Sequence, residues 1–81
     1  MDQIARTAKQ IGASIRRRRR TLDLRQSDVG DKANLRQATI SALENGESGI
    51  RLRTLIDVMA ALDLELVIRE RSRAIDIEDI F

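Results

Sequence analysis

The sequence predicts a small all-α domain of four to five helices, followed by one C-terminal β-strand. Two short amphipathic stretches with a tight turn between them lie within residues 24–46, and an apolar stripe with helical spacing follows from residue 52. After residue 63 the pattern changes to alternating apolar and charged residues, which is typical of a strand. A domain of 81 residues buries only about 60% of the surface of its unfolded chain, so we expect a partner subunit.

The first predicted helix covers residues 3–22. Its apolar residues fall on one side of the helix: Ile4, Ala8, Ile11, Ile15 and Leu22. Five consecutive arginines at 16–20 interrupt this stripe and spread around the axis. At least one of them must therefore lie at the edge of the core, and the others are solvated or bound to anions. The alternative is a solvated face that attracts anions in general.

The next two predicted helices cover residues 26–33 and 37–44. They direct a shared set of apolar side chains towards one core, namely Leu24, Val29, Ala33, Leu35, Ile40 and Leu43. Asn34 lies between the helices at a position that tolerates a left-handed backbone. Asn45 and Gly46 end the helix predicted over residues 37–44, as Asn and Gly commonly do.

A loop over residues 47–51 leads into the fourth predicted helix. Its buried face is expected to consist of Leu52, Leu55, Ile56, Met59 and Leu62. A lone strand has no sheet to join in a helical chain, so we expect it to pair with the same strand of a second copy in a twofold homodimer. This intersubunit two-stranded sheet would contain Leu64, Leu66, Val67, Ile68 and Arg69. The alternative is a chain end that folds back on its own core.

Charge is distributed unevenly along the chain. Residues 1–36 carry ten Lys and Arg against four Asp, whereas residues 74–81 carry three acids and no base. The first part therefore suits a polyanion. We divide the chain into a helical domain (1–63), a dimerisation strand (64–71) and an acidic tail (72–81) that we expect to be flexible. The alternative for the tail is docking into a partner through Ile77, Ile80 and Phe81.

Several classes of protein are excluded by composition. The chain has no cysteine, which excludes disulfides and thiolate metal sites and fits a cytoplasmic location. No apolar run approaches the roughly 20 residues of a membrane span, and the first residues lack the apolar core of a signal peptide. Without His, Cys, Tyr or a glycine-rich phosphate loop, we expect no catalysis, no cofactor and no metal.

Residues 24–46 resemble the phage-repressor (XRE/Cro-like) class of helix-turn-helix proteins, which makes double-stranded DNA the expected partner. The pattern of that class is L-x-Q-x-x-L-A-x-x-x-G-V-S-x-x-x-I-S-x-x-E-x-G. It is matched by Leu24, Gln26, Ile40, Ser41, Glu44 and Gly46.

The departures from this pattern are Val29 and Gly30 in place of Leu-Ala, Asn34 in place of the turn glycine, and Leu35 and Arg36 in place of Val-Ser. The asparagine is a mild change, because Asn is the best non-glycine residue for a left-handed turn. Gly30 is expected to cost up to about 1 kcal/mol relative to alanine inside a helix.

Within this class, residues 37–41, the Glu44-Asn45 pair and the strand after the fourth helix most resemble the HipB-type antitoxins. The resemblance covers about residues 11–70. It implies a homodimer that binds palindromic operator DNA, represses its own toxin-antitoxin operon and neutralises a HipA-like serine/threonine kinase toxin. Two alternatives stay open. One is a stand-alone or phage-type transcriptional repressor, and the other is a protein-interaction module of the same fold that does not bind DNA.

In this class the first residue of the second helix and the start of the third contact DNA. Gln37 is the best candidate to read a base, because its amide can pair with N6 and N7 of adenine. Ala38 and Ala42 can touch only a thymine methyl, so we expect sparse direct readout and a large share of shape readout. The expected DNA-binding set is Gln26, Arg36, Gln37, Ala38, Thr39, Ser41, Ala42, Asn45, Arg51 and Arg53. Phosphate contacts are expected from Gln26, Ser41, Asn45, Arg51 and Arg53.

The resemblance also implies a structural ion pair between Arg19 and Glu44. That pair assigns one arginine of the run to the fold. The other four, Arg16, Arg17, Arg18 and Arg20, are left as candidates for phosphate contacts or for an acidic surface of the toxin.

Overall fold

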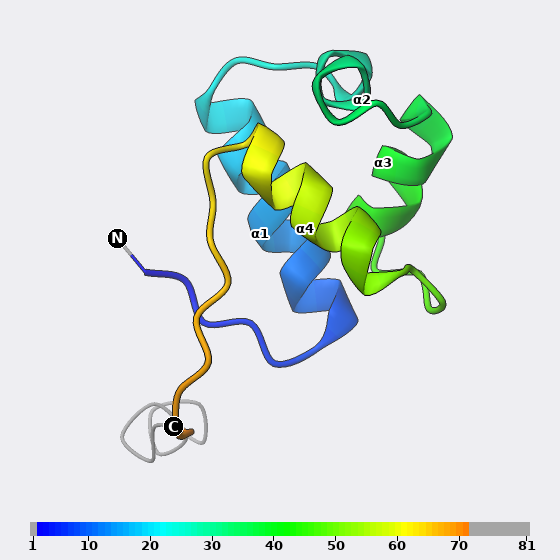
Figure 1. Ribbon diagram of the computed structural model, residues 1–81. Helices are drawn as coiled ribbons and strands as arrows, with labels where there is room; N and C mark the ends of the chain where they lie inside the picture. Colours follow the sequence, from blue (N-terminus) through cyan, green and yellow to red (C-terminus); the bar gives the residue numbers. More distant parts are fainter. Residues whose placement is uncertain (1, 72–81) are drawn as a thin grey trace.

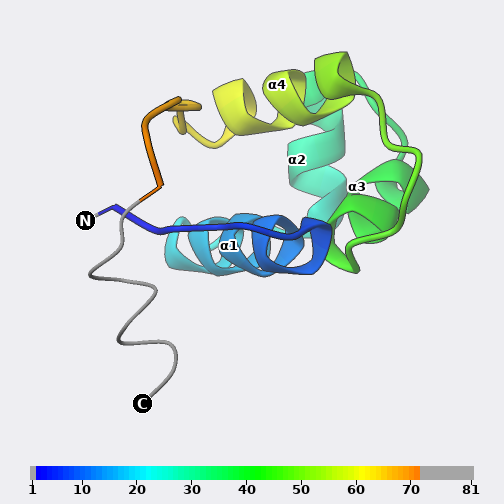
Figure 2. The same cartoon turned by 90° about the horizontal axis from the view of Figure 1, so that it is seen from below.

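The computed structural model describes residues 2–71 of the chain. This part forms four helices, α1 (Ala8–Thr21), α2 (Gln26–Ala33), α3 (Gln37–Glu44) and α4 (Leu52–Ala61). α4 lies on one side of the molecule, α1 and α3 lie on the other, and α2 runs between them (Figures 1 and 2). The described part has the predicted all-α architecture, with the predicted bounds for α2 and α3.

α1 begins at Ala8, so the prediction of a helix from Gln3 was wrong at its N-terminal end. Thr7 has an extended backbone, and its hydroxyl accepts a hydrogen bond of 3.1 Å from the backbone N–H of Gln10. The side chain of Gln10 in turn accepts from the backbone N–H of Arg6 at 2.6 Å. The Thr7 hydroxyl satisfies a backbone donor that has no partner inside the helix, and the Gln10 bond fixes the preceding residue, which places the helix start at this point.

A tight turn fixes α2 against α3. Asn34 adopts the left-handed conformation with φ of 58°, as the sequence predicts, and the next N–H, that of Leu35, donates to the carbonyl oxygen of Gly30 at 2.8 Å. A Cβ atom at Gly30 would lie 2.7 Å from the carbonyl oxygen of Leu35. The expectation that alanine would be better than glycine here is corrected, because the turn backbone occupies the space that the methyl group needs.

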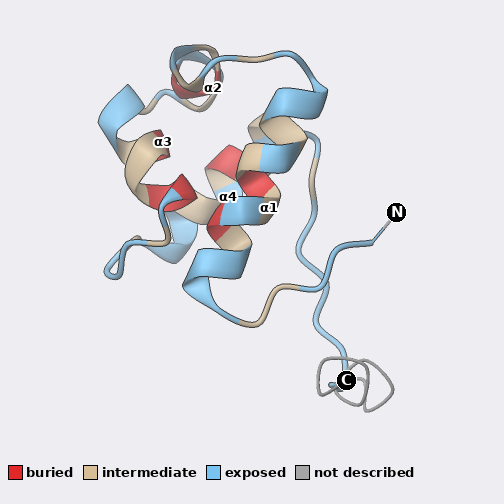
Figure 3. Cartoon of the chain, turned by 180° about the vertical axis from the view of Figure 1, so that it is seen from behind, coloured by how far each residue is buried: buried red, intermediate tan, exposed pale blue. Residues whose placement is uncertain are grey.

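The core lies where the four helices face one another (Figure 3). Its buried residues are Ile15, Val29, Ile40, Leu43, Val58 and Leu62. Partly buried side chains pack around them, among them Ile11, Leu24, Leu35, Leu55 and Leu64. Every helix therefore contributes at least one buried side chain to a single core, which holds the α2-turn-α3 unit in place.

The buried face of α4 differs from the predicted one. Val58 is fully buried, whereas Leu52 and Ile56 are 62% and 47% exposed. α4 is apolar on more than one side, so the spacing of its apolar residues alone did not define which side meets the core. The correction leaves an exposed apolar strip on α4, consisting of Leu52 and Ile56.

Residues 64–71 form neither helix nor strand in the isolated chain. Leu64 packs against the core, while Leu66, Val67 and Ile68 are exposed. This segment lies on the side of the molecule away from α3, and residues 2–7 run from that side to the start of α1 (Figures 1 and 2). The intersubunit strand stays a prediction, because it needs the strand of a second copy as its partner. The predicted acidic tail, with Ile77, Ile80 and Phe81, lies outside the described residues.

Within residues 2–71, no helix has both the length and the apolar character needed to cross a membrane. In the same range, no three acidic side chains gather in a way that would hold a metal ion.

Candidate nucleic-acid interface

Glu44, the last residue of α3, is the centre of a polar cluster between α1, α2 and α3. Its side chain is fully buried and accepts hydrogen bonds from Arg19 Nε at 2.6 Å and Arg19 Nη2 at 2.9 Å. Arg16 Nε and Gln26 Nε2 each donate to its Oε1 at 3.2 Å. The Arg19 contact is the ion pair that the family resemblance implies. The Arg16 and Gln26 contacts were not expected from the sequence.

The Glu44 carboxylate is held in its charged form. Burial by itself would raise its pKa, but hydrogen bonds from Arg19, Gln26 and Arg16 outweigh burial and hold the pKa below its ordinary value. The same hydrogen bond from Arg19 raises the pKa of that guanidinium. No buried side-chain polar atom among the described residues lacks a hydrogen-bond partner. The cluster therefore stabilises the helices as a fully satisfied network.

Close packing of α1 against α3 brings these side chains together. Gly12 of α1 is buried, and a Cβ atom there would lie 2.5 Å from the carbonyl oxygens of both Leu43 and Glu44. The two backbones are thus nearer than a side chain would permit. Arg16 and Arg19 follow Gly12 by one and two turns, which places both guanidinium groups beside the end of α3.

A chain of hydrogen bonds connects Glu44 to the start of α3. Gln26 Nε2 donates to Glu44, and Gln26 Oε1 accepts a hydrogen bond of 3.3 Å from Gln37 Nε2. The direction of both bonds follows from the carboxylate, because an ionised carboxylate only accepts. Gln26 must turn its amino group to Glu44 and its oxygen to Gln37, so Gln37 must act as a donor.

This arrangement leaves Gln37 with one unused N–H and an unused Oε1, since an amide carries two donors and one carbonyl oxygen. Gln37 is the exposed first residue of α3. It therefore presents one donor and one acceptor side by side to a molecule outside the protein. That pair is complementary to a group with an acceptor next to a donor.

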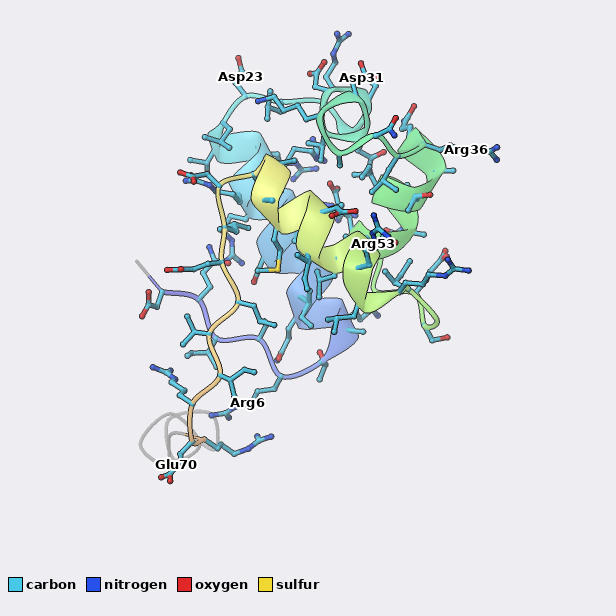
Figure 4. The ribbon with its side chains drawn as sticks, in the orientation of Figure 1. Arg6, Asp23, Asp31, Arg36, Arg53 and Glu70 are labelled. Carbon is cyan, nitrogen blue, oxygen red and sulfur yellow. The ribbon has the colours of Figure 1, made fainter. Side chains whose placement is uncertain are left out.

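The other residues predicted to contact DNA lie around this position. Arg36, Ala38 and Asn45 are exposed, while Thr39, Ser41, Ala42 and Gln26 are half-buried. Arg36 extends away from the molecule at the start of α3, and Arg53 lies near the start of α4 (Figure 4). Arg51 and Arg53 are both exposed. The structure thus places the whole predicted set at or near the surface along α3 and at the starts of α2 and α4.

Arginine occupies the N-cap position of three helices, with Arg25 before α2, Arg36 before α3 and Arg51 before α4. α3 and α4 have neither a side-chain cap nor an acidic residue in the first turn. A cation at the positive end of a helix dipole is unfavourable in the isolated protein. An anion bound at these N-termini would meet open N–H groups and reverse that effect.

The five arginines of α1 differ in what their side chains contact. Arg19 bonds Glu44, and Arg18 Nε donates to the carbonyl oxygen of Leu62 at 3.0 Å, which ties α1 to the end of α4. Arg16 bridges Glu44 and Asn45, whose Oδ1 accepts from Arg16 Nη2 at 3.0 Å. Arg17 and Arg20 are exposed. Arg18 thus also has a role in the fold, and its assignment to phosphate or toxin contacts stays a prediction.

Solved structures of other proteins have the same fold as this chain. Among solved structures, the chain is similar to one described as "HipB-O4 20mer complex", with a TM-score of 0.82, 24% identity, and coverage of 88% of this chain and 100% of that one. Two others, described as "Structure of HipA-HipB-O2-O3 complex" and "MDT Protein", each give a TM-score of 0.81, 24% identity and the same coverage. At this identity the likeness establishes the fold. No curated protein matches the sequence.

The helix-turn-helix family, compared by sequence, matches residues 15–68. The matched range contains α2, the Asn34 turn and α3, together with Arg19 and Glu44. The chain therefore belongs to the helix-turn-helix family.

Proposed function

We propose that the chain is a DNA-binding transcriptional repressor that reads a palindromic operator as a homodimer. The observation that carries this proposal is the Glu44-Gln26-Gln37 chain of hydrogen bonds, which leaves Gln37 with one donor and one acceptor at the exposed start of α3. Adenine presents N7 as an acceptor and N6 as a donor in the major groove. Guanine presents two acceptors there, which the fixed Gln37 amide does not match.

Backbone contacts would hold this reading position in register. The open N-termini of α3 and α4, with Arg36, Arg51 and Arg53 beside them, offer N–H donors and positive charge to phosphates. Ala38 and Ala42 offer only methyl contacts, so sequence-dependent bending between half-sites would supply much of the remaining specificity. The dimerisation segment, Leu64 to Arg69, would set the distance between the two α3 helices.

The experiment is a selection of duplexes from random-sequence DNA with the full chain, followed by fluorescence anisotropy at several salt concentrations. We expect an affinity that falls steeply with salt. Gln37→Ala should weaken binding by about 1–3 kcal/mol and relax the preference for adenine at one position of each half-site. Gln3→Ala, an exposed glutamine outside the helices, is the control and should change neither quantity. If the affinity of the parent chain for DNA does not change with salt, the remaining hypothesis is a protein-interaction module that does not bind DNA.

We further propose that the repressor is the antitoxin of a HipA-like serine/threonine kinase. The support is the likeness to chains described as parts of HipB complexes, one of which also contains HipA. Co-expression with a kinase encoded beside this gene should give a stable complex on gel filtration. A neighbouring kinase that elutes separately, or the absence of any such gene, would favour the stand-alone repressor.

A further inference from the structure

The outer side of α1 is a cationic surface that the fold does not use. α1 contains six basic residues and no acid. Gly12 and Ile15 define its buried side, while Ala13, Arg17 and Arg20 are exposed. Ala13, Arg16, Arg17, Arg20 and Thr21 line a shallow surface hollow, and we call these five residues the α1 arginine face.

Apart from Arg16, the cations of this face have a folding cost without a compensating side-chain contact in the described part of the chain. Arg16 and Arg20 are four residues apart, and Arg17 and Arg20 are three apart, so like charges are neighbours on the helix surface. Such pairs destabilise a helix. The guanidinium groups of Arg17 and Arg20 have no hydrogen-bond or ion-pair partner within residues 2–71. Their charge is therefore available to an external anion.

The α1 arginine face continues the candidate nucleic-acid interface. Arg16 belongs to the face and bonds Asn45, the residue that follows α3, at 3.0 Å. Arg20 lies one turn further, towards the start of α2, at roughly 6 Å along the helix axis. α1 and α3 lie on the same side of the molecule, opposite α4 (Figure 2). A ligand that covers α3 can thus extend over α1 without a break.

We propose that the α1 arginine face binds backbone phosphates of the duplex outside the base pairs read by α3, and so lengthens the contacted DNA. The inference rests on the proposed DNA-binding function. Duplex DNA presents closely spaced phosphates along each strand. Arginines one helical turn apart, such as Arg16 and Arg20, can therefore contact more than one of them. A guanidinium also binds phosphate through two parallel N–H groups, which suits a row of arginines.

The test compares two duplexes that carry the selected core, one ending at the core and one with ten mixed-sequence base pairs on each side. Arg17→Gln, Arg20→Gln and the double variant are measured on both by anisotropy over a salt series. Lys32→Gln is the control, because Lys32 is exposed at the end of α2 opposite Gln26. Thermal unfolding by circular dichroism is recorded for every variant.

On the flanked duplex, each arginine variant should lower the slope of log affinity against log salt by about 0.9, and the double variant by about twice that. On the short duplex the slopes should stay close to the parent value. Because a like-charge repulsion is removed, the unfolding temperature should stay the same or rise. Weaker binding with an equal or higher unfolding temperature excludes misfolding as the cause.

Equal slopes for parent and double variant on the flanked duplex would overturn the inference while leaving the proposed function intact. The same holds if the double variant loses only its binding to the kinase, since the face would then contact an acidic protein. A parent chain that binds neither duplex would instead overturn the proposed function itself.

Discussion

The two sides of this molecule differ in whether their side chains have partners within the same chain. Between α1, α2 and α3, the side chains of Arg16, Arg19 and Gln26 donate to Glu44, and each polar atom that is buried there has a partner. On α4 and the segment after it, apolar side chains lie in solvent, with Ile68 91% exposed and Leu52 62% exposed. The buried network at Glu44 is complete within a single chain, whereas the apolar surface of α4 and the segment after it is complete only when something covers it.

This difference separates folding from assembly. Side chains of the Glu44 cluster should change the stability of each chain, because they connect helices of the same copy. Side chains after Leu64 should change association instead, because they contact little of their own fold. Measurements that record stability and mass on the same variants can therefore confirm or contradict the comparison.

The largest effect on stability is expected at Glu44. Glu44→Ala would leave the Arg19 side chain, only 11% exposed, without its anion, and would also remove one of the two partners of Arg16 and of Gln26. Removal of one partner from a buried ion pair costs about 3–5 kcal/mol. Urea unfolding followed by circular dichroism measures it. Glu47→Ala, an exposed glutamate in the following loop, is the matched control. A loss similar to that of the control would contradict the structural role of the cluster.

Gly12→Ala should have the next largest effect, and its sign separates two explanations. Helix propensity alone predicts that alanine stabilises α1 by up to about 1 kcal/mol. The structure predicts the opposite, because the new methyl group would lie 2.5 Å from two carbonyl oxygens of α3. Overpacking of this kind costs typically about 1–3 kcal/mol. Ser14→Ala on the same helix tests propensity without the clash, so a gain in both variants would show that α1 and α3 do not pack this closely.

The sequence predicts those features of the structure that are determined by residues close together in the chain. The bounds of α2 and α3 and the left-handed turn at Asn34 follow from residue types that act within a few positions. The start of α1 could also have been found, since Thr7-Ala8-Lys9-Gln10 fits the capping box with its Thr at the cap and Gln three residues later.

The remaining features depend on contacts between distant residues. Spacing along α4 favoured Leu52 and Ile56 as core residues, but the position of α2, the helix that packs most against α4, decides which side is covered. The roles of Arg16 and Arg18 likewise depend on Asn45 and Leu62, which are far along the chain. The polarity of the Gln26-Gln37 pair requires Glu44 to lie beside it, which the spacing of the three residues in sequence does not reveal.

Ile68→Asp should have the smallest effect on the stability of the single chain and a decisive one on its assembly. Ile68 is almost fully exposed in the isolated chain, so an aspartate there should change the free energy of unfolding of the monomer by no more than about 0.5 kcal/mol. In a two-stranded sheet between copies, the same aspartate would oppose apolar or like-charged side chains across the twofold axis. Light scattering after gel filtration should give a dimer for the parent and a monomer for Ile68→Asp. Glu70→Ala, an exposed change two residues further along, should remain a dimer. A parent chain that is monomeric at high micromolar concentration would contradict the prediction of an intersubunit strand. The exposed apolar residues of α4 would then need another partner.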